Sequence, residues 1–339
     1  MTRTFASRIA TLTVVAAVAL AGCSTTPSRE SRPTIVPAQA AVAPEPTVPP
    51  AGTVSPSGAG EGLAFDPVGR RLAAIVGNEV IVYDVDGGLR EVGRSTLSAR
   101  PSQVVPNRDG GFLIAAGKQA VVLPRNTGAD GSVTVGSKTF DVDADVLTVA
   151  PYSRDGVTVL AGTKNGEIVA LGAPSGPKTI TGPVEASRIL VHGSDVAVVD
   201  RLQSSITTVD VPGGKIGKGL RVGRGVTNAA VDPNGRVFAV DTGKNQVIGY
   251  TVAPLMERFL YPEAGSPWAV DYDATGKLMW VTRTATNQVV GYALGSGIPE
   301  QRKLYPTVRQ PNAIAVDAKT GTLYVQSATG AGIQAIPTR

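Results

Sequence analysis

The stretch TNAAVDPNGRVFAV, residues 227–240, contains the pattern that decides the fold. A short apolar segment ends at Asp232, a Pro-Asn-Gly turn follows, and a second apolar segment completes the stretch. Clear copies of this pattern begin at Asn312, Glu61 and Trp268. Because Asp, Asn and Gly favour tight turns, each copy predicts two adjacent strands joined by a short turn.

Weaker copies begin at Ser102, Leu147 and Ser187, which gives seven copies spaced 40 to 45 residues apart. Each copy continues with a third apolar segment, and in six copies a fourth, more polar segment follows. Four short strands per period of about 42 residues is the signature of a β-propeller blade. The predicted fold class is therefore all-β, a seven-bladed β-propeller with four antiparallel strands per blade that spans residues 61–339.

The seventh copy reaches Arg339 after only three strands. A propeller closes more stably when the missing strand comes from the other end of the repeats, because that strand covers an open sheet edge. From the offset of the other outer strands, we expect this closing strand near residues 52–57.

Residues 1–22 have the features of a signal peptide. Two arginines in the first eight residues precede an uncharged apolar run at 9–20, which is too short to span a bilayer and fits the apolar region of a signal. The run leads into Leu-Ala-Gly-Cys at 20–23, which resembles the bacterial lipobox. The resemblance implies cleavage before Cys23 and a covalent lipid on its sulfur. The alternative is an ordinary signal peptide with an incidental cysteine.

Residues 23–60 form a predicted tether between the lipid and the propeller. The segment is rich in Pro, Ser, Thr and Ala and has few large apolar residues, so we expect it to be disordered or polyproline-like. The apolar triplet at 34–36 either docks on the body or belongs to the tether. These features predict an extracytoplasmic protein anchored to the cell membrane as a lipoprotein.

The composition excludes several classes of protein. Hydrophobic residues make up 42% of the 339 residues, enough for a large core, while 40 Gly and 25 Pro argue against long helices. One Cys and one His cannot form a disulfide framework or a Cys/His zinc site. The formal net charge of +5 is spread without long runs, so a nucleic acid is not expected as a partner.

Pro-x-Ala-Val-Asp-x-x-Gly type motifs at 267–276 and 311–321, with Asn-x-Val-x-x-Tyr runs at 245–250 and 287–292, resemble the YncE-like and NHL-repeat propellers. Together with the lipobox and the tether, the chain resembles actinobacterial envelope lipoproteins of the mycobacterial LppL type. The resemblance implies a fold and a location but specifies no activity. The Gly-His and Trp-Asp signatures of WD40 blades are missing.

The recurrent aspartates are interpreted as turn residues, because each stands at a strand end before a Gly-containing turn. They are Asp66, Asp232, Asp273 and Asp317. His192 occupies the same position in the fourth copy, with no Ser or Cys nucleophile motif around it. No catalytic residue and no cofactor other than the covalent lipid on Cys23 is therefore predicted, and an enzymatic activity is uncertain and less favoured.

Basic residues gather in the loops that should share one face of the disc. The predicted ligand or partner site consists of Arg100, Arg188, Arg224, Trp268 and Arg309. Arginine pairs with carboxylates and phosphates, and tryptophan offers an apolar plate. The alternative is a solvated basic rim without a ligand.

The leading functional hypothesis is a binding or scaffold module for an envelope protein or an anionic envelope ligand. The competing hypothesis is a metal-dependent, lactonase-like hydrolase with its site on the propeller axis. In that case Glu61 and Asn312, which neighbour each other around the ring, would contribute metal ligands. A purely structural scaffold is the third hypothesis.

Overall fold

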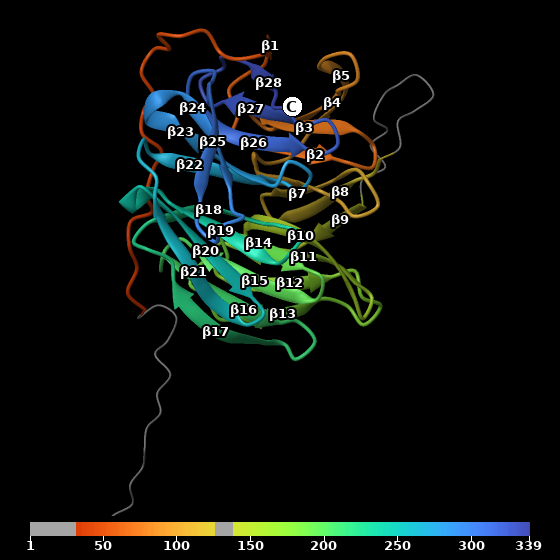
Figure 1. Cartoon of the computed structure of the whole chain (residues 1–339). Coiled ribbons are helices and arrows are strands. Elements are labelled where there is room, and N and C mark those ends of the chain that lie inside the picture. The colour runs from red at the N-terminus through yellow and green to blue at the C-terminus, as the bar shows by residue number, and fades with distance from the viewer. Residues whose placement is uncertain (1–31, 126–137) are drawn as a thin grey trace, which may run out of the picture. The chain divides into compact units, whose positions relative to one another are not determined.

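The computed structural model describes residues 32–125 and 138–339, and residues 33–339 form one compact unit (Figure 1). Seven four-stranded antiparallel sheets make up this unit, which confirms the predicted seven-bladed propeller. Cys23 and the signal peptide lie outside the described residues, so the lipidation remains a prediction.

Each of the first six blades is a meander of four consecutive strands. Blade 1 contains β2 (Gly62–Asp66), β3 (Arg71–Val76), β4 (Glu79–Asp84) and β5 (Arg90–Thr96). Blade 2 contains β6 (Pro101–Pro106), β7 (Phe112–Ala116), β8 (Gln119–Leu123) and β9 (Lys138–Asp141). Blade 3 contains β10 (Val146–Arg154), β11 (Val157–Thr163), β12 (Glu167–Leu171) and β13 (Lys178–Thr181).

The second half of the ring repeats the arrangement. Blade 4 contains β14 (Arg188–His192), β15 (Asp195–Asp200), β16 (Ser205–Asp210) and β17 (Lys215–Arg221). Blade 5 contains β18 (Val226–Val231), β19 (Arg236–Asp241), the 3₁₀ helix η2 (Thr242–Lys244), β20 (Gln246–Val252) and β21 (Leu255–Pro262). Blade 6 contains β22 (Pro267–Asp273), β23 (Leu278–Arg283), η3 (Thr284–Thr286), β24 (Gln288–Ala293) and β25 (Glu300–Pro306).

Blade 7 joins the two ends of the described propeller. It contains β26 (Pro311–Asp317), β27 (Thr322–Ser327), β28 (Ile333–Pro337) and, as its outer strand, β1 (Thr53–Ser55). Thr53 pairs with Ala335 and Ser55 with Ile333, so the closing strand lies inside the 52–57 segment that was expected to supply it. Gly52, with a φ of +70°, lets the chain come close to β28. A Cβ at this position would lie 2.1 Å from the carbonyl oxygen of Ala335.

The core is divided into layers between neighbouring blades. Each of the seven apolar clusters in the described residues combines side chains from two adjacent blades. The Asn-x-Val-x-x-Tyr runs belong to this packing. In the run at 287–292, Trp280 is fully buried over Gly291, where a Cβ would come within 2.8 Å of the indole ring. The runs therefore contain glycine because a large ring from the neighbouring strand covers it.

The recurrent aspartates are turn residues, as interpreted from the sequence. Asp66 is fully buried and accepts hydrogen bonds from the backbone N–H of Val68 at 2.9 Å and of Gly111, in the next blade, at 2.7 Å. Asp317 likewise caps its turn through Lys319 N–H at 3.0 Å and pairs with Arg70 of blade 1. Buried backbone donors require such partners, so these carboxylates hold turns and tie blades together.

The loops define two faces of the disc. In an antiparallel meander, the loops between second and third strands and the connections to the next blade lie at one end of the blade. We call this end the strap face. The turns between first and second strands lie at the opposite end, the turn face.

Residues 33–51, which we call the strap, run along the strap face and end at β1 (Figure 1). Ala43 is buried there, with 1% of its surface exposed, and the backbone of Ile35 donates to the carbonyl oxygen of Leu202 at 2.8 Å. The expectation of a disordered tether up to residue 60 is therefore wrong for this segment. Polar groups on the propeller loops bind the main chain of the strap. The composition of the strap does not reveal these contacts.

Candidate functional site

Four inner strands carry a polar side chain at the second position of the repeat, where the other three have Gly or Ala. Each of these side chains hydrogen-bonds to the backbone of the next inner strand. The pairs are Gln103 Oε1 with Val149 N–H (2.8 Å), Thr148 Oγ1 with Ile189 N–H (3.1 Å), Arg188 Nε with Ala229 O (3.2 Å) and Asn228 Nδ2 with Trp268 O (3.0 Å). This belt fixes the inner strands of blades 2 to 6 around the axis.

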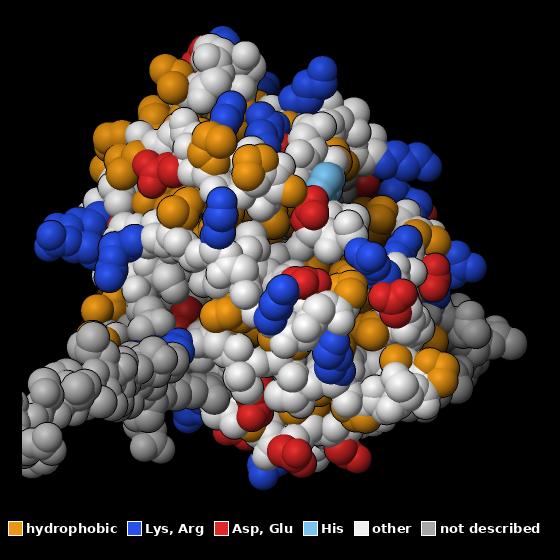
Figure 2. Space-filling view, turned by 90° about the horizontal axis from the view of Figure 1, so that it is seen from below, with side chains coloured by type: hydrophobic (Ala, Val, Ile, Leu, Met, Phe, Trp, Pro, Cys, Tyr) orange, Lys and Arg blue, Asp and Glu red, His pale blue; other side chains and the backbone are white. Residues whose placement is uncertain are grey.

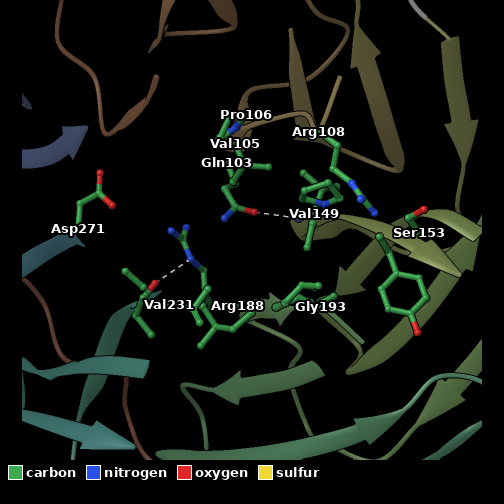
Figure 3. Close-up of a pocket in the computed structure, with 18 residues that line it drawn as sticks. Gln103, Val105, Pro106, Arg108, Val149, Ser153, Arg188, Gly193, Val231 and Asp271 are labelled. Atoms are coloured by element: carbon green, nitrogen blue, oxygen red, sulfur yellow. Dashed lines mark hydrogen bonds between the residues drawn. The ribbon is translucent and has the colours of Figure 1, made fainter. Parts of the chain in front are cut away.

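A cavity of about 520 Å³ lies beside this belt, between the inner strands of blades 2 to 6 (Figure 3). A second cavity of about 590 Å³ also includes Arg188 and Asp271 and reaches Pro67, Pro233 and Lys319 in the turns of the turn face. The axial space is therefore lined from the belt to the turn face. Apolar and polar groups both line the two cavities, with apolar groups in the majority.

Asp271 is the one charged side chain at the fourth position of the inner strands, which holds Ala, Val or Leu in the other six copies. Its carboxylate accepts hydrogen bonds from the N–H of Tyr272 at 2.8 Å and of Val316 at 3.1 Å. Burial raises the pKa of Asp271 to about 6, although these hydrogen bonds and the charge of Arg188 act in the opposite direction. The carboxyl group therefore titrates close to neutral pH.

Arg188 faces Asp271 across the cavity (Figure 3). Its Nε bonds to Ala229 O, and among the described residues its guanidinium forms no ion pair. Burial lowers the pKa of Arg188, and the charge of Asp271 partly offsets that effect. An arginine remains protonated in proteins, so the cavity holds a cation whose terminal nitrogens are left for a ligand.

The five residues predicted to bind a ligand do not form one open surface. Arg100 and Arg224 are exposed on the strap face, whereas Arg188 lies in the axial cavity. Arg309 is bound to the strap, with its Nε donating to Ala43 O at 3.2 Å and a terminal nitrogen paired with Glu45. The prediction placed all five in an open mouth because it treated the strap as a free linker.

Trp268 is not an open plate for a ligand. Only 9% of its surface is exposed, and it packs in the core between blades 6 and 7, where Ala40 of the strap also packs. The guanidinium carbon of Arg201 lies 5.9 Å from its ring centroid. Since Arg201 also donates to Ala38 O at 3.1 Å, the indole is covered by a side chain that the strap holds.

Glu61 and Asn312 are neighbours, as expected from the adjacency of blades 1 and 7 in the closed ring. However, Asn312 Nδ2 donates to Glu61 Oε1 at 3.0 Å, and Asn312 Oδ1 accepts from Gln310 Nε2 at 3.0 Å. The amide oxygen that a cation would use is thus engaged with a glutamine. In residues 32–125 and 138–339, no group of three or more His, Cys, Asp or Glu side chains is placed to hold a metal ion.

Asp271, Gln103 and the strap-binding residues Ser266 and Gln310 were missed by the sequence interpretation, whereas Asn287 was expected in a loop on this face. Asp271 carried a signal, because a charged residue replaces an apolar one at a repeated position. The strap-binding residues carried none, since the groups they bind are main-chain atoms.

The rest of the surface has mixed charge. On the side shown in Figure 2, Lys and Arg side chains alternate with acidic and apolar ones and form no continuous basic patch. None of the helices in the part of the chain that the structure describes is long and apolar enough to cross a membrane.

Many solved structures share this architecture. The β-propeller domain of Cps50 (Swd1) from Myceliophteria thermophila has a TM-score of 0.69 over 85% of this chain and 99% of that chain, at 13% identity. The shared feature is the propeller fold. A streptogramin B lyase structure gives 0.66 at 14% identity, covering 85% of this chain and 96% of its own.

Hydrazine synthase from Kuenenia stuttgartiensis gives a TM-score of 0.67 at 12% identity, covering 84% of this chain and 97% of that chain. No protein-family model matches the sequence, and no match is found among curated proteins. At these identities the similarity shows the fold alone.

Proposed function

We propose that this chain is a membrane-anchored, extracytoplasmic lipoprotein whose propeller binds an anionic ligand of the cell envelope. The lipobox at 20–23 and its resemblance to LppL-type envelope lipoproteins support the anchor. The axial cavity supports the binding role, and the observation that carries it is Arg188. This half-buried guanidinium has no ion-pair partner among the described residues and faces a space large enough for a small molecule.

A carboxylate or phosphate group would pair with the terminal nitrogens of Arg188, and the apolar part of the cavity wall would strengthen that pair relative to the same contact in open water. Asp271 opposes an anion while it is ionised. Because its pKa is raised to about 6, protonation on mild acidification removes this repulsion, so anion binding is expected to strengthen as the pH falls through 6.

The binding proposal is tested with sn-glycerol 3-phosphate as the anionic probe and glycerol as the uncharged control. We expect calorimetry to detect binding of the phosphate only, with at least about tenfold weaker binding in Arg188→Gln. Asp271→Asn is expected to bind more tightly at pH 7 and to lose the part of the pH dependence that Asp271 causes. The second ionisation of the phosphate, at about pH 6, affects the wild type and the variant alike, so their difference reports on Asp271. Equal binding by the wild type and Arg188→Gln would overturn the assignment of the site.

The anchor is tested separately. Cys23→Ser removes the sulfur that would carry the acyl chains, and about two chains are needed for stable membrane attachment. Labelled fatty acid should be incorporated into the wild type only, and only the wild type should partition into detergent. A variant that still carries lipid would contradict the lipobox interpretation.

The hydrolase alternative is tested by metal analysis of the purified protein and of Glu61→Ala. The hydrogen bonds within Glu61, Asn312 and Gln310 favour a structural role for this group. A stoichiometric divalent ion that is lost in the variant would instead support the metal site.

A further inference from the structure

The strap is bound mainly through its backbone. Its main-chain groups form hydrogen bonds with the loops and strand ends of blades 4 to 7. The contacts are Ile35 N–H to Leu202 O (2.8 Å), Ala38 O from Arg201 (3.1 Å), Ala41 N–H to Ser266 Oγ (3.0 Å), Ala43 O from Arg309 (3.2 Å), Pro44 O from Asn287 (2.9 Å) and Ala51 O from Gln334 (2.6 Å). Contacts of this kind recognise an extended peptide with little regard to most of its side chains.

Gln310 provides the most specific of these contacts. Its Nε2 donates to Ala41 O at 2.9 Å and its Oε1 accepts from Ala43 N–H at 2.8 Å. The carboxamide therefore pairs with alternate backbone groups of the strap, as a neighbouring β-strand would. Asn287 orients this residue, because its Oδ1 accepts from Gln310 N–H at 2.9 Å while its Nδ2 donates to Pro44 O.

Backbone strain is located at the same residues. Ser266, Asn287 and Gln310 have φ values of +57°, +51° and +55°, in the left-handed region that non-glycine residues rarely adopt. The same conformation recurs in other turns of the propeller, at Arg70, Asp155, Ser204, Asn245 and Lys277. In the three strap-binding residues, which lie in three separate connections or loops, it accompanies side chains that bind the strap.

One strap position is read by its side chain. The methyl group of Ala43 is buried. Val36 and Val42 expose 90% and 86% of their surfaces, and Glu45 pairs with Arg309 while 79% of its own side chain stays exposed. The site therefore selects a small residue at the position of Ala43, and an exposed ion pair such as that of Glu45 adds little.

We propose that the strap face is a binding site for an extended peptide from a partner protein, with a small residue at the position of Ala43, and that the strap occupies this site in cis. The site is independent of the axial cavity and of any anionic ligand bound there. A partner segment can bind only when the strap leaves. Because the strap belongs to the same chain, its effective concentration at the site is high, and this sets the partner concentration that is needed to displace it.

The test uses full-length chains and a fluorescent peptide of residues 37–46, PAQAAVAPEP. Ala43→Glu places a charge in a buried position and should release the strap, which elastase cleavage would report. Val42→Glu is the matched control, because the neighbouring side chain is exposed and the strap should stay bound. In fluorescence polarisation, we expect the peptide to bind Ala43→Glu and to bind neither the wild type nor Val42→Glu.

Adding Gln310→Ala to Ala43→Glu should weaken peptide binding about tenfold or more, since two hydrogen bonds are lost. Adding Asn234→Ala, on the turn face, should leave it unchanged. A chain lacking residues 33–48 provides the same measurement without reliance on the substitution. Absence of peptide binding by this chain would overturn the proposal. Dimerisation of Ala43→Glu through exchange of straps between two copies would also overturn it, because the occupant would then be a second copy of this chain.

Discussion

The two faces of the propeller use the same repeat in different ways. On the turn face, the recurrent aspartates bind turns of their own and adjacent blades. In the axial space between the faces, Arg188 and Asp271 are left with charge facing the cavity. On the strap face, Arg201 and Arg309 are occupied by carbonyl oxygens and a carboxylate from the chain's own N-terminal segment. A basic residue in a loop is therefore a candidate ligand contact only after its intramolecular partners are known.

The largest difference between the faces should appear on truncation from the N-terminus. A chain beginning at residue 58 lacks β1 and exposes the edge of β28, which should lower the free energy of unfolding by several kcal/mol. A chain beginning at 49 keeps β1 but loses the strap contacts, each worth roughly 1 kcal/mol or less. Denaturant unfolding should rank these two chains below one beginning at 33; equal stability of the chains beginning at 33 and 49 would contradict strap docking.

A smaller effect is expected at the junction of the strap and β1. Gly52→Ala places a Cβ against the carbonyl group of Ala335 in addition to the strain of its positive φ, so we expect a loss of about 2 kcal/mol or more. Gly77→Ala is the control: its φ is +60°, but no atom lies within 4 Å of the added Cβ. It should lose only about 1 kcal/mol. Similar melting temperatures for both variants would argue against close packing at Gly52.

Asp66→Ala tests the turn face. Removal of the buried carboxylate leaves the N–H groups of Val68 and Gly111 without their acceptor, which should cost about 1–3 kcal/mol. Asp66→Asn keeps one acceptor oxygen and should recover part of the loss. Full stability of Asp66→Ala in thermal unfolding would contradict the role of this residue in joining blades 1 and 2.

Asp271 should make the stability of the wild type depend on pH, and here its carboxylate destabilises the fold while it is ionised. Because its pKa in the folded protein is raised to about 6 from an ordinary 3.8, the folded state binds more protons than the unfolded state between these values. Stability from this group therefore increases as the pH falls from about 6 to 4, by at most about 3 kcal/mol. Asp271→Asn should lack this increase, and parallel pH profiles for variant and wild type would contradict a raised pKa of Asp271.

The smallest effects are expected from the arginines of the strap face. Arg309→Ala removes the bond to Ala43 O and the pair with Glu45, which should cost about 1 kcal/mol. Arg100→Ala changes an exposed side chain and should alter stability by less than about 0.5 kcal/mol. Calorimetric melting that ranks Arg100→Ala below Arg309→Ala would reverse the assignment of partners on this face.

The periodic parts of the molecule were predictable, and the non-periodic contacts were not. Seven copies of the strand–turn–strand pattern specify the blades, and the missing fourth strand of blade 7 pointed to the segment containing Thr53–Ser55. Alternation of apolar residues marks a buried strand wherever it recurs. The strap has no such alternation, because its binding depends on loop groups such as the Gln310 carboxamide that contact backbone atoms common to every sequence.

Docking of the strap changes the linker length that matters if Cys23 carries the lipid. Treated as a free tether, residues 24–60 would reach on the order of 100 Å. With Ile35 bound at Leu202, only the residues between Cys23 and Ile35 remain, which extend to about 40 Å at most. The point of attachment also moves from blade 1, where the chain enters β2, to the loop between β15 and β16 in blade 4. The lipid would then lie within about 40 Å of this loop, which is less than half the reach of the free tether.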